Sequence, residues 1–469
     1  MPLKFGTSGV RGLVTEMTDA ACYRYTRAFA EYLKDKSLSE TVSLAGDYRS
    51  STPRIMRAVA HAITDSGLSV DNCGMVPTPA VAYQGLRHER ASIMVTGSHI
   101  PDDRNGIKFN MPWGEVLKAD EAEISKRCGA LEDVDPGSSP ELPEVSGEAR
   151  ASYVERYRAF FPAGCLDGLT VVVYQHSSVL RDILPEIIGG LGAEVVPVGW
   201  SDAFVAVDTE AVEDPERLAA WVQEHGADAL ASADGDGDRP LVVDEAGKVI
   251  RGDVLGILVA DFLGADAVST PVSCNTALER SGRFPRTQRT RIGSPYVIAA
   301  MTEAVEHGGR TVVGYEANGG FLTATDITHP DTGTVLGALP TRDAVLPILS
   351  ALIAGKREKS LSSLAADLPS RYTASGLLRG FPNDRGKALV AEFQGGGKDV
   401  AGKYFKDIFG TVESLDFTDG ARITFQGGDV VHLRPSGNAP EFRCYTESET
   451  EETAVRNNGK ALEIVERLR

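Results

Sequence analysis

The feature that most constrains the fold of this chain is the alternation of short apolar runs with longer amphipathic segments. The order run, segment, run occurs at residues 41–46, 53–66 and 92–96, and again at 169–174, 179–191 and 194–198. Short apolar runs are typical of buried strands, and amphipathic segments of the helices that connect parallel strands. The pattern therefore predicts an α/β protein.

The two passages also share local chemistry. A tyrosine and a pair of serines stand between strand and helix in residues 47–51 and again in residues 173–178. Each predicted helix ends at a glycine, Gly67 or Gly192, the residue that most easily forms a left-handed cap. This internal repeat indicates duplicated α/β units.

The rest of the chain divides into further units. A third α/β unit is predicted from a helix beginning at Asp253, strands at 268–273 and 311–314, and a helix after Pro295. Beyond residue 368 the pattern changes to short alternating strands at 421–425 and 429–433, and to a final helix at 449–469. A segment rich in Pro, Gly, Ser and acids at 133–147 indicates a linker. At about 150 residues per domain, we expect three related α/β domains and a smaller α+β domain, at 1–147, 148–249, 250–367 and 368–469.

Composition excludes several classes of protein. The chain of 469 residues has 48 basic and 66 acidic residues, a formal charge of −18, which makes nucleic acid and anionic membranes improbable partners. The most apolar stretch, 254–268, is interrupted by Asp261 and Asp266, and residues 1–14 contain no continuous signal core. Six scattered cysteines indicate reduced thiols. We expect a cytoplasmic enzyme, monomeric or homodimeric.

The strongest candidate site is an acidic loop at residues 234–239. Asp234, Asp236 and Asp238 alternate with glycines directly after an apolar run. Carboxylates in this pattern can converge on one hard divalent cation. A calcium loop with Glu245 at its twelfth position is the alternative, but Arg239 stands at the sixth position, where that loop needs glycine. The sequence therefore favours Mg²⁺.

Other loops also follow predicted strands. Ser98 is a candidate nucleophile, because Gly97 gives the backbone room to expose it and His99 stands beside it. Lys108 lies further along the same polar loop. Glu316 and Asn318, beside Gly319, suit hydrogen bonding to vicinal sugar hydroxyls. Side chains and backbone amides able to surround a phosphate come from Arg434, Ser436, Gly437 and Asn438. Residues 6–12 form a glycine-spaced loop with one cation, Arg11, and do not have the P-loop spacing.

Five loops in this order resemble those of the α-D-phosphohexomutase family, over nearly the whole chain. Residues 5–12 match its opening loop, 96–99 its phosphoserine loop, 234–239 its magnesium loop, 316–319 its sugar loop and 434–438 its phosphate loop. The resemblance implies four domains around a central cleft. It also implies a hexose phosphate substrate and a hexose 1,6-bisphosphate activator.

Carried onto this chain, the resemblance implies a role for each loop. Ser98 carries a phosphoryl group, and Mg²⁺ bridges it to Asp234, Asp236 and Asp238. Either His99 or Lys108 is the general base, and Arg11 and Arg239 supply positive charge. The substrate is then held by Glu316, Asn318, Gly319, Arg434, Ser436, Gly437 and Asn438. A phosphomannomutase is the first expectation.

Some alternatives stay open. Asn438 replaces the threonine of many family members, and Ser294 the histidine common in enzymes for mannose and glucose. A phosphoglucomutase or a phosphoglucosamine mutase is therefore also considered. A phosphosugar hydrolase would use the same serine and metal while admitting water, and a metal-stabilised binding protein would not need Ser98.

Overall fold

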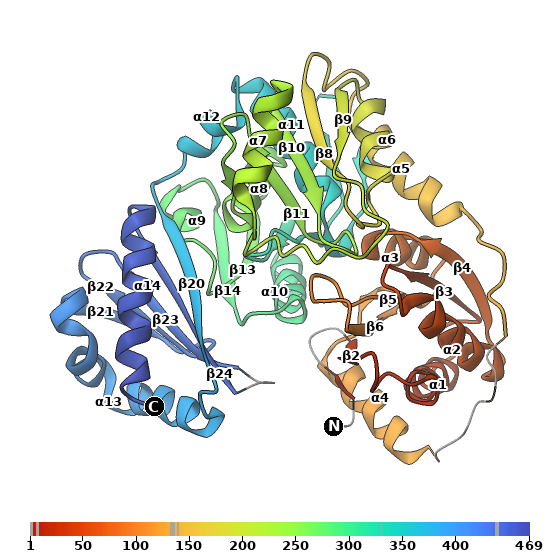
Figure 1. The fold of residues 1–469 in the computed structure, drawn as a ribbon, viewed down its shortest axis with the longest axis horizontal. Helices are drawn as coiled ribbons and strands as arrows, with labels where there is room; N and C mark the ends of the chain where they lie inside the picture. The colour runs from red at the N-terminus through yellow and green to blue at the C-terminus, as the bar shows by residue number, and fades with distance from the viewer. Residues whose placement is uncertain (1–2, 6–8, 132–136, 138–139, 330, 437–439) are drawn as a thin grey trace.

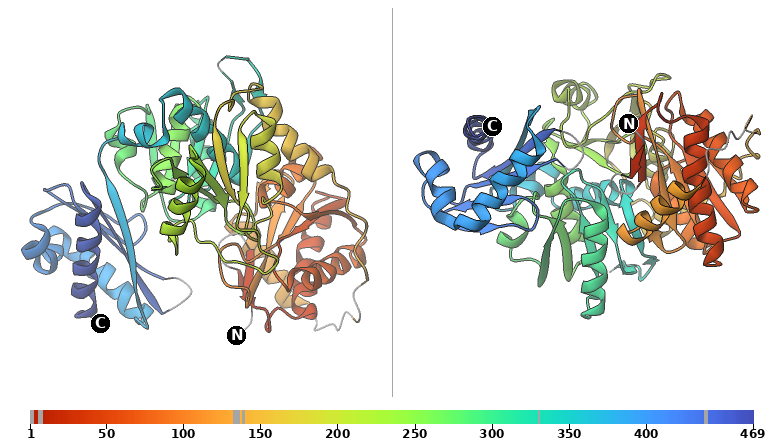
Figure 2. Two further views of the ribbon diagram at one scale, coloured as in Figure 1. Left: turned by 45° about the horizontal axis from the view of Figure 1, so that its top comes forward. Right: turned by 90° about the horizontal axis from the view of Figure 1, so that it is seen from below.

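The structure is a computed structural model, and it describes residues 3–5, 9–131, 137, 140–329, 331–436 and 440–469. Four sheet-containing units follow one another around an arch, from the red N-terminal unit to the blue C-terminal unit (Figure 1). The views of Figure 2 show the same arrangement from two further directions. The first three units combine parallel strands with covering helices, and the fourth is α+β, as the sequence predicts.

The first unit is built on a mixed sheet in the order β1-β2-β6-β5-β3-β4, with β7 paired to β6. Parallel pairing joins β3 to β4 and β5, and β6 runs antiparallel to β5. The elements are β1 (Lys4–Phe5), β2 (Gly9–Leu13), α1 (Asp19–Asp35), β3 (Thr41–Gly46), α2 (Thr52–Asp65), β4 (Ser69–Met75), α3 (Thr78–Arg87), β5 (Ser92–Val95), β6 (Arg104–Met111), β7 (Gly114–Glu115) and α4 (Lys118–Ala130).

The second unit has the sheet order β12-β11-β10-β8-β9. Its elements are α5 (Glu148–Phe160), β8 (Thr170–Tyr174), α6 (Ile183–Gly190), β9 (Glu194–Val198), α7 (Pro215–His225), β10 (Ala229–Ala233), β11 (Pro240–Asp244) and β12 (Val249–Ile250). The helix predicted at 179–191 begins four residues late. The preceding turn is bound to the acidic loop instead, because Ser178 Oγ donates to the Asp234 carbonyl and the Val179 amide to that of Gly235.

The third unit has the sheet order β14-β13-β15-β16-β19 and a separate β17-β18 hairpin. Its elements are α8 (Gly252–Phe262), β13 (Ala267–Pro271), α9 (Ala277–Arg280), β14 (Arg286–Thr290), α10 (Ser294–Glu306), β15 (Val312–Tyr315), β16 (Phe321–Thr323), β17 (Ile327–Thr328), β18 (Val335–Leu336), β19 (Leu339–Asp343), α11 (Val345–Arg357) and α12 (Leu361–Ala366). One apolar core runs through the second and third units, so they pack as neighbours.

The fourth unit is an antiparallel sheet in the order β20-β24-β23-β22-β21 with two helices. Its elements are β20 (Tyr372–Arg379), α13 (Asn383–Phe409), β21 (Val412–Asp416), β22 (Ala421–Phe425), β23 (Val430–Pro435), β24 (Glu441–Ser448) and α14 (Glu451–Glu466). The sequence analysis missed α13, since three consecutive glycines interrupt it and Gly397 is not helical. Apolar packing of Phe393, Phe405 and Phe409 against the sheet offsets that weakness.

All six cysteines are unpaired, and five of them are buried. Over the residues that the structure describes, no helix has the length and apolar character needed to cross a membrane.

Candidate active site

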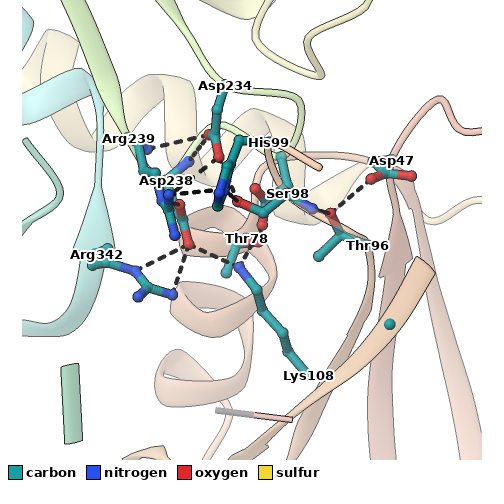
Figure 3. Close-up of polar contacts among 12 residues, drawn as sticks. Asp47, Thr78, Thr96, Ser98, His99, Lys108, Asp234, Asp238, Arg239 and Arg342 are labelled. Atoms are coloured by element: carbon teal, nitrogen blue, oxygen red, sulfur yellow. Dashed lines mark hydrogen bonds and ion pairs between the residues drawn. The ribbon is translucent and has the colours of Figure 1, made fainter. Parts of the chain in front are cut away.

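Side chains from three units meet at one point. The loop after β5 carries Ser98, the loop after β10 carries the acidic triad, and β19 contributes Arg342 (Figure 3). In sheets of this type the carboxyl ends of parallel strands are the usual place for a ligand site, because the loops that follow adjacent strands emerge there together.

Ser98 is fully buried and its backbone lies in the left-handed region, with φ of 57°. Few residues other than glycine adopt this conformation, so the surrounding contacts must hold it. The Ser98 amide donates to Thr96 Oγ1 over 2.8 Å, and the Thr96 hydroxyl donates to Asp47 over 2.7 Å. Ser98 Oγ donates in turn to Asp234 Oδ2 over 2.6 Å. The nucleophile candidate is thereby aimed at the acidic loop.

Arg49 supports the serine loop by hydrogen bonds to its backbone carbonyls. Its fully buried guanidinium pairs with Asp47 and donates to the Ser98 carbonyl over 2.7 Å. Three further carbonyls of the loop accept from the same group, those of Ile100, Pro101 and Arg104. A Cβ on Gly97 would lie 2.6 Å from Arg49 Cζ, so only glycine leaves room for this contact.

The three aspartates of the acidic loop converge. Asp234, Asp236 and Asp238 are fully buried, and one oxygen of each lies within 4.8 Å of the others. Lys108 Nζ contacts Asp236 over 2.5 Å and Asp238 over 2.8 Å. Thr78, at the start of α3, donates its hydroxyl to Asp236 over 2.5 Å.

The three carboxyls differ in charge preference. Burial, reinforced by the other two carboxylates, raises the pKa of Asp234 well above its usual value. Burial also opposes ionisation of Asp236, but Lys108 outweighs it and the pKa of Asp236 is lowered. At Asp238 the effect of burial is overcome chiefly by Arg342, and the pKa is again lowered. Three clustered carboxyls of this kind are stabilised by a cation.

The donor set fits a hard divalent cation. Among the described residues, Asp236 Oδ1 and Asp238 Oδ1 are buried without any hydrogen-bond partner. Orphaned buried oxygens are costly unless a ligand satisfies them. The acidic loop connects the antiparallel strands β10 and β11, not two helices as in the helix-flanked calcium loop. With Ser98 Oγ nearby, the available ligands are all oxygens.

His99, Arg239 and Arg11 lie around the same point. Arg239 Nη1 is 2.8 Å from His99 Nδ1, which is also 3.4 Å from Ser98 Oγ. Burial, followed by the charge of Arg239, lowers the pKa of His99 to about 3. Burial and Arg239 likewise lower the pKa of Arg11 to about 10. Positive charge is therefore concentrated beside the serine.

The sugar loop is linked to the metal loop by Arg342. This buried guanidinium contacts Glu316 over 3.1 Å and Asp238 over 3.0 Å. The Asn318 side chain accepts from the Gly320 amide, and Gly319 has φ of 87° in the turn. Glu316, Asn318 and Gly319 are thus brought to the site, although Asn318 Oδ1 is used within its own loop.

The predicted phosphate loop lies in the fourth unit. Arg434 pairs with Asp419 of that unit over 2.9 Å, and the Ser436 amide donates to the Glu441 carbonyl over 2.8 Å. Gly437 and Asn438 lie outside the described residues. In Figure 1 this unit stands across the arch from the first unit, apart from the serine loop.

Sequence reasoning missed Arg342, Arg49 and Thr78. Arg342 stands between a threonine and an aspartate in β19, so a charged residue at this position carries no signal in the sequence. Arg49 lies in the Tyr-Arg-Ser-Ser passage identified as a repeat, without any indication that it is buried. Thr78 carried no signal, because its partner Asp236 is 158 residues away.

Comparison with known proteins shows which family the chain belongs to. Four models of phosphoglucomutase/phosphomannomutase domains match, α/β/α domains I, II and III at residues 2–134, 151–247 and 251–372, and the C-terminal domain at 382–457. A phosphomannomutase of Sinorhizobium fredii is 43% identical over 96% of each chain. One of Salmonella muenchen is 42% identical over 96% of this chain and 93% of the relative.

The fold has solved counterparts. A crystal structure of a phosphoglucomutase/phosphomannomutase family protein from Burkholderia thailandensis superposes with a TM-score of 0.76 at 21% identity, covering 98% of this chain and 96% of that one. The resemblance inferred from five loops is thus confirmed over almost the whole chain. This chain belongs to the phosphoglucomutase/phosphomannomutase family.

Proposed function

We propose that this chain is a phosphomannomutase, which interconverts mannose 6-phosphate and mannose 1-phosphate through phosphorylated Ser98. The observation that carries the proposal is the buried Ser98 hydroxyl held 2.6 Å from Asp234, at the edge of the acidic triad. The two phosphomannomutases at 42–43% identity over almost the whole chain support mannose as the sugar.

The reaction consists of two phosphoryl transfers. The C1 hydroxyl of mannose 6-phosphate attacks the phosphorus on Ser98, its proton passes to a base, and the bond from phosphorus to Ser98 Oγ breaks. The product is mannose 1,6-bisphosphate, which turns over in the site. Ser98 Oγ then attacks the phosphorus at C6, and mannose 1-phosphate leaves. Such transfers depend mainly on alignment and on neutralisation of charge.

We assign the metal ligands to Asp234, Asp236, Asp238 and Ser98, and the metal to Mg²⁺. All-oxygen ligands are those that Mg²⁺ prefers. Bound there, the ion supplies positive charge to the transferring phosphoryl group. Arg239 and Arg11 add fixed charge on the same side, while Lys108 and Arg342 balance the carboxylates.

The base is either His99 or Lys108. His99 Nδ1 lies 3.4 Å from Ser98 Oγ and accepts from Arg239, which keeps the imidazole neutral. Lys108 is close to the triad and pairs with two of its carboxylates, Asp236 and Asp238. Comparing His99→Gln with Lys108→Met separates them, because loss of the base lowers kcat more than it changes KM.

The substrate is proposed to bridge the domains. Domains 1–147, 148–249, 250–367 and 368–469 supply the phosphoserine, metal, sugar and phosphate loops respectively. Arg434, Ser436, Gly437 and Asn438 hold the phosphate that is not reacting. Glu316, Asn318 and Gly319 bind ring hydroxyls, and Arg342 orients Glu316 through their 3.1 Å contact.

The test is ³¹P NMR of mannose 1-phosphate with the protein, Mg²⁺ and a trace of hexose 1,6-bisphosphate as activator. We expect a mannose 6-phosphate signal, absent with Ser98→Ala, while Ser152→Ala, on helix α5, serves as a matched serine control outside the site. Release of inorganic phosphate would instead identify a phosphosugar hydrolase. Undiminished activity of Ser98→Ala would refute the phosphoserine mechanism.

A second candidate is a mutase for glucose or glucosamine phosphates. The residue that favours it is Ser294, at the start of α10, whose hydroxyl donates to the buried Glu115 over 2.7 Å. The family resemblance implies a histidine at this position in enzymes for mannose and glucose. Parallel assays with glucose 1-phosphate and glucosamine 1-phosphate rank the three sugars by kcat/KM. The largest value identifies the substrate.

A further inference from the structure

A cavity lined mostly by charged residues lies between the third and fourth units. It has a volume of about 270 Å³ and is bounded by α9 and β14 on one side and by β22 and β23 on the other. Arg371, just before β20, closes it at the connection between the two units. The cavity therefore touches both units and the segment that joins them.

Four arginines line this cavity, against the two carboxylates Glu279 and Asp416. These arginines are Arg280, Arg289, Arg371 and Arg422. Two are already neutralised, because Arg289 forms a bidentate pair with Glu279 at 2.7 and 2.8 Å, and Arg371 Nε contacts Glu447 at 2.5 Å.

The remaining two cations are incompletely balanced. Arg422 forms a long ion pair with Glu447, at 3.8 Å, and no ion pair to Arg280, an exposed residue at the mouth of the cavity, is found in the described residues. Burial, and then the charge of Arg289, lowers the pKa of Arg422. An anion in the cavity would relieve this repulsion.

Two of these guanidinium groups, those of Arg280 and Arg371, approach Gly428. A Cβ placed on this residue would lie 3.3 Å from Arg280 Nη2 and 3.8 Å from Arg371 Nη1, so the missing side chain leaves a cradle between them. Arg371 is 4% exposed, and its Nη1 has no hydrogen-bond partner among the described residues. A buried guanidinium donor of this kind calls for an acceptor.

The cavity is distinct from the phosphate loop assigned above. Val430 lines the cavity and Ser436 belongs to the phosphate loop, at opposite ends of β23. Six residues of extended strand separate them by about 20 Å. The lining residues include none of those assigned to the mutase reaction.

We propose that this cavity binds a small oxyanion, inorganic phosphate or the phosphate group of a small ester, on Arg280, Arg371 and Arg422 around Gly428. Guanidinium forks match the geometry of phosphate oxygens. The volume is below the range usual for whole drug-sized ligands, which favours a small anion. Because its ligands come from both units, the anion also fixes the fourth unit relative to the third.

The test is calorimetric titration of the full chain with inorganic phosphate. It is done in an Arg434→Ala background, so that the phosphate loop contributes little. We expect binding to persist in that background and to weaken at least about tenfold on adding Arg280→Ala, because a charged hydrogen bond is lost. Adding Arg286→Ala, which removes an exposed arginine of the same unit outside the cavity, leaves binding unchanged.

A second pair of variants keeps every charge. Gly428→Ala fills the cradle and should abolish binding, whereas Gly410→Ala, at a matching φ of 83° and with no atom within 4 Å of its Cβ, should not. Thermal melting of each variant verifies that it is folded. Binding that is absent in the Arg434→Ala protein, or that survives both Arg280→Ala and Gly428→Ala, overturns the proposal.

The source of the anion follows from one further titration. Mannose 1-phosphate replaces inorganic phosphate in the same background. Tighter binding of the ester, lost with Arg280→Ala, supports a phosphate ester as the ligand. Equal or weaker binding of the ester, with phosphate binding still dependent on Arg280, supports the free anion.

Discussion

Replacing Arg49 with lysine tests how the serine loop is held. The buried guanidinium makes five donations, to Asp47 and to the carbonyls of Ser98, Ile100, Pro101 and Arg104. A lysine ammonium has only three donors. At least two acceptors therefore lose their partners, at about 1–3 kcal/mol each. We expect Arg49→Lys to lower the free energy of unfolding of the first domain by about 4 kcal/mol.

Scanning calorimetry of the full chain is the suitable assay, because the domains of a long chain can unfold in separate transitions. The transition of the first domain should move down by about 10 °C. Mutase turnover should also fall, because Ser98 loses the contact that supports its left-handed backbone.

Arg87→Lys is the matched control. Arg87 is partly exposed and forms a surface pair with Glu148 at 3.3 Å, so the change should cost less than about 0.5 kcal/mol. A loss below about 1 kcal/mol for Arg49→Lys would show that the guanidinium contacts do not support the loop.

Three further predictions concern the triad, the sugar loop and the fourth domain. Asp236→Asn should weaken Mg²⁺ activation at least about tenfold without unfolding the chain, measured by activity against Mg²⁺ concentration. Arg342→Gln leaves the buried Glu316 and Asp238 without their shared cation, so stability should fall by about 3–5 kcal/mol and KM should rise; urea unfolding and kinetics measure both. Burial lowers the pKa of His432 to about 4, although the hydrogen bond from its ring to the Asp419 carbonyl acts to raise that pKa. The unfolded imidazole, with a pKa of about 6.5, takes up a proton first, so this histidine should lower stability by about 2 kcal/mol as the pH drops from 6.5 to 5. His432→Gln should remove that contribution from the pH slope in urea unfolding, while other histidines with a lowered pKa, such as His99, keep theirs.

Each of these has an outcome that contradicts it. Unchanged activity of Asp236→Asn at low micromolar Mg²⁺ would place the metal elsewhere. A wild-type KM for Arg342→Gln would separate Arg342 from the sugar loop. An unaltered pH slope in His432→Gln would mean that other groups cause the acid sensitivity.

The sequence by itself determined the parts of this protein that depend on neighbours along the chain. Alternating apolar runs and amphipathic segments predicted strands close to β3, β13 and β22, because periodicity reports which face of an element is buried. The alternating aspartates predicted the triad, because three carboxylates within five residues of one loop can bring their oxygens close enough together to hold one cation. Helix α13 was not predicted, because its glycines have low helix propensity. Tertiary packing of its apolar side chains stabilises the helix in spite of them.

Only the tertiary structure decided which distant residues complete the site. Ser98 meets Asp234 across 136 positions, Lys108 meets Asp236 across 128, and Arg342 meets Asp238 across 104. Local propensity contains no information about such pairs, because they form when separate sheets are packed together. Burial is also a tertiary property, and it is burial that makes Arg49 a support for the serine loop and not a surface charge.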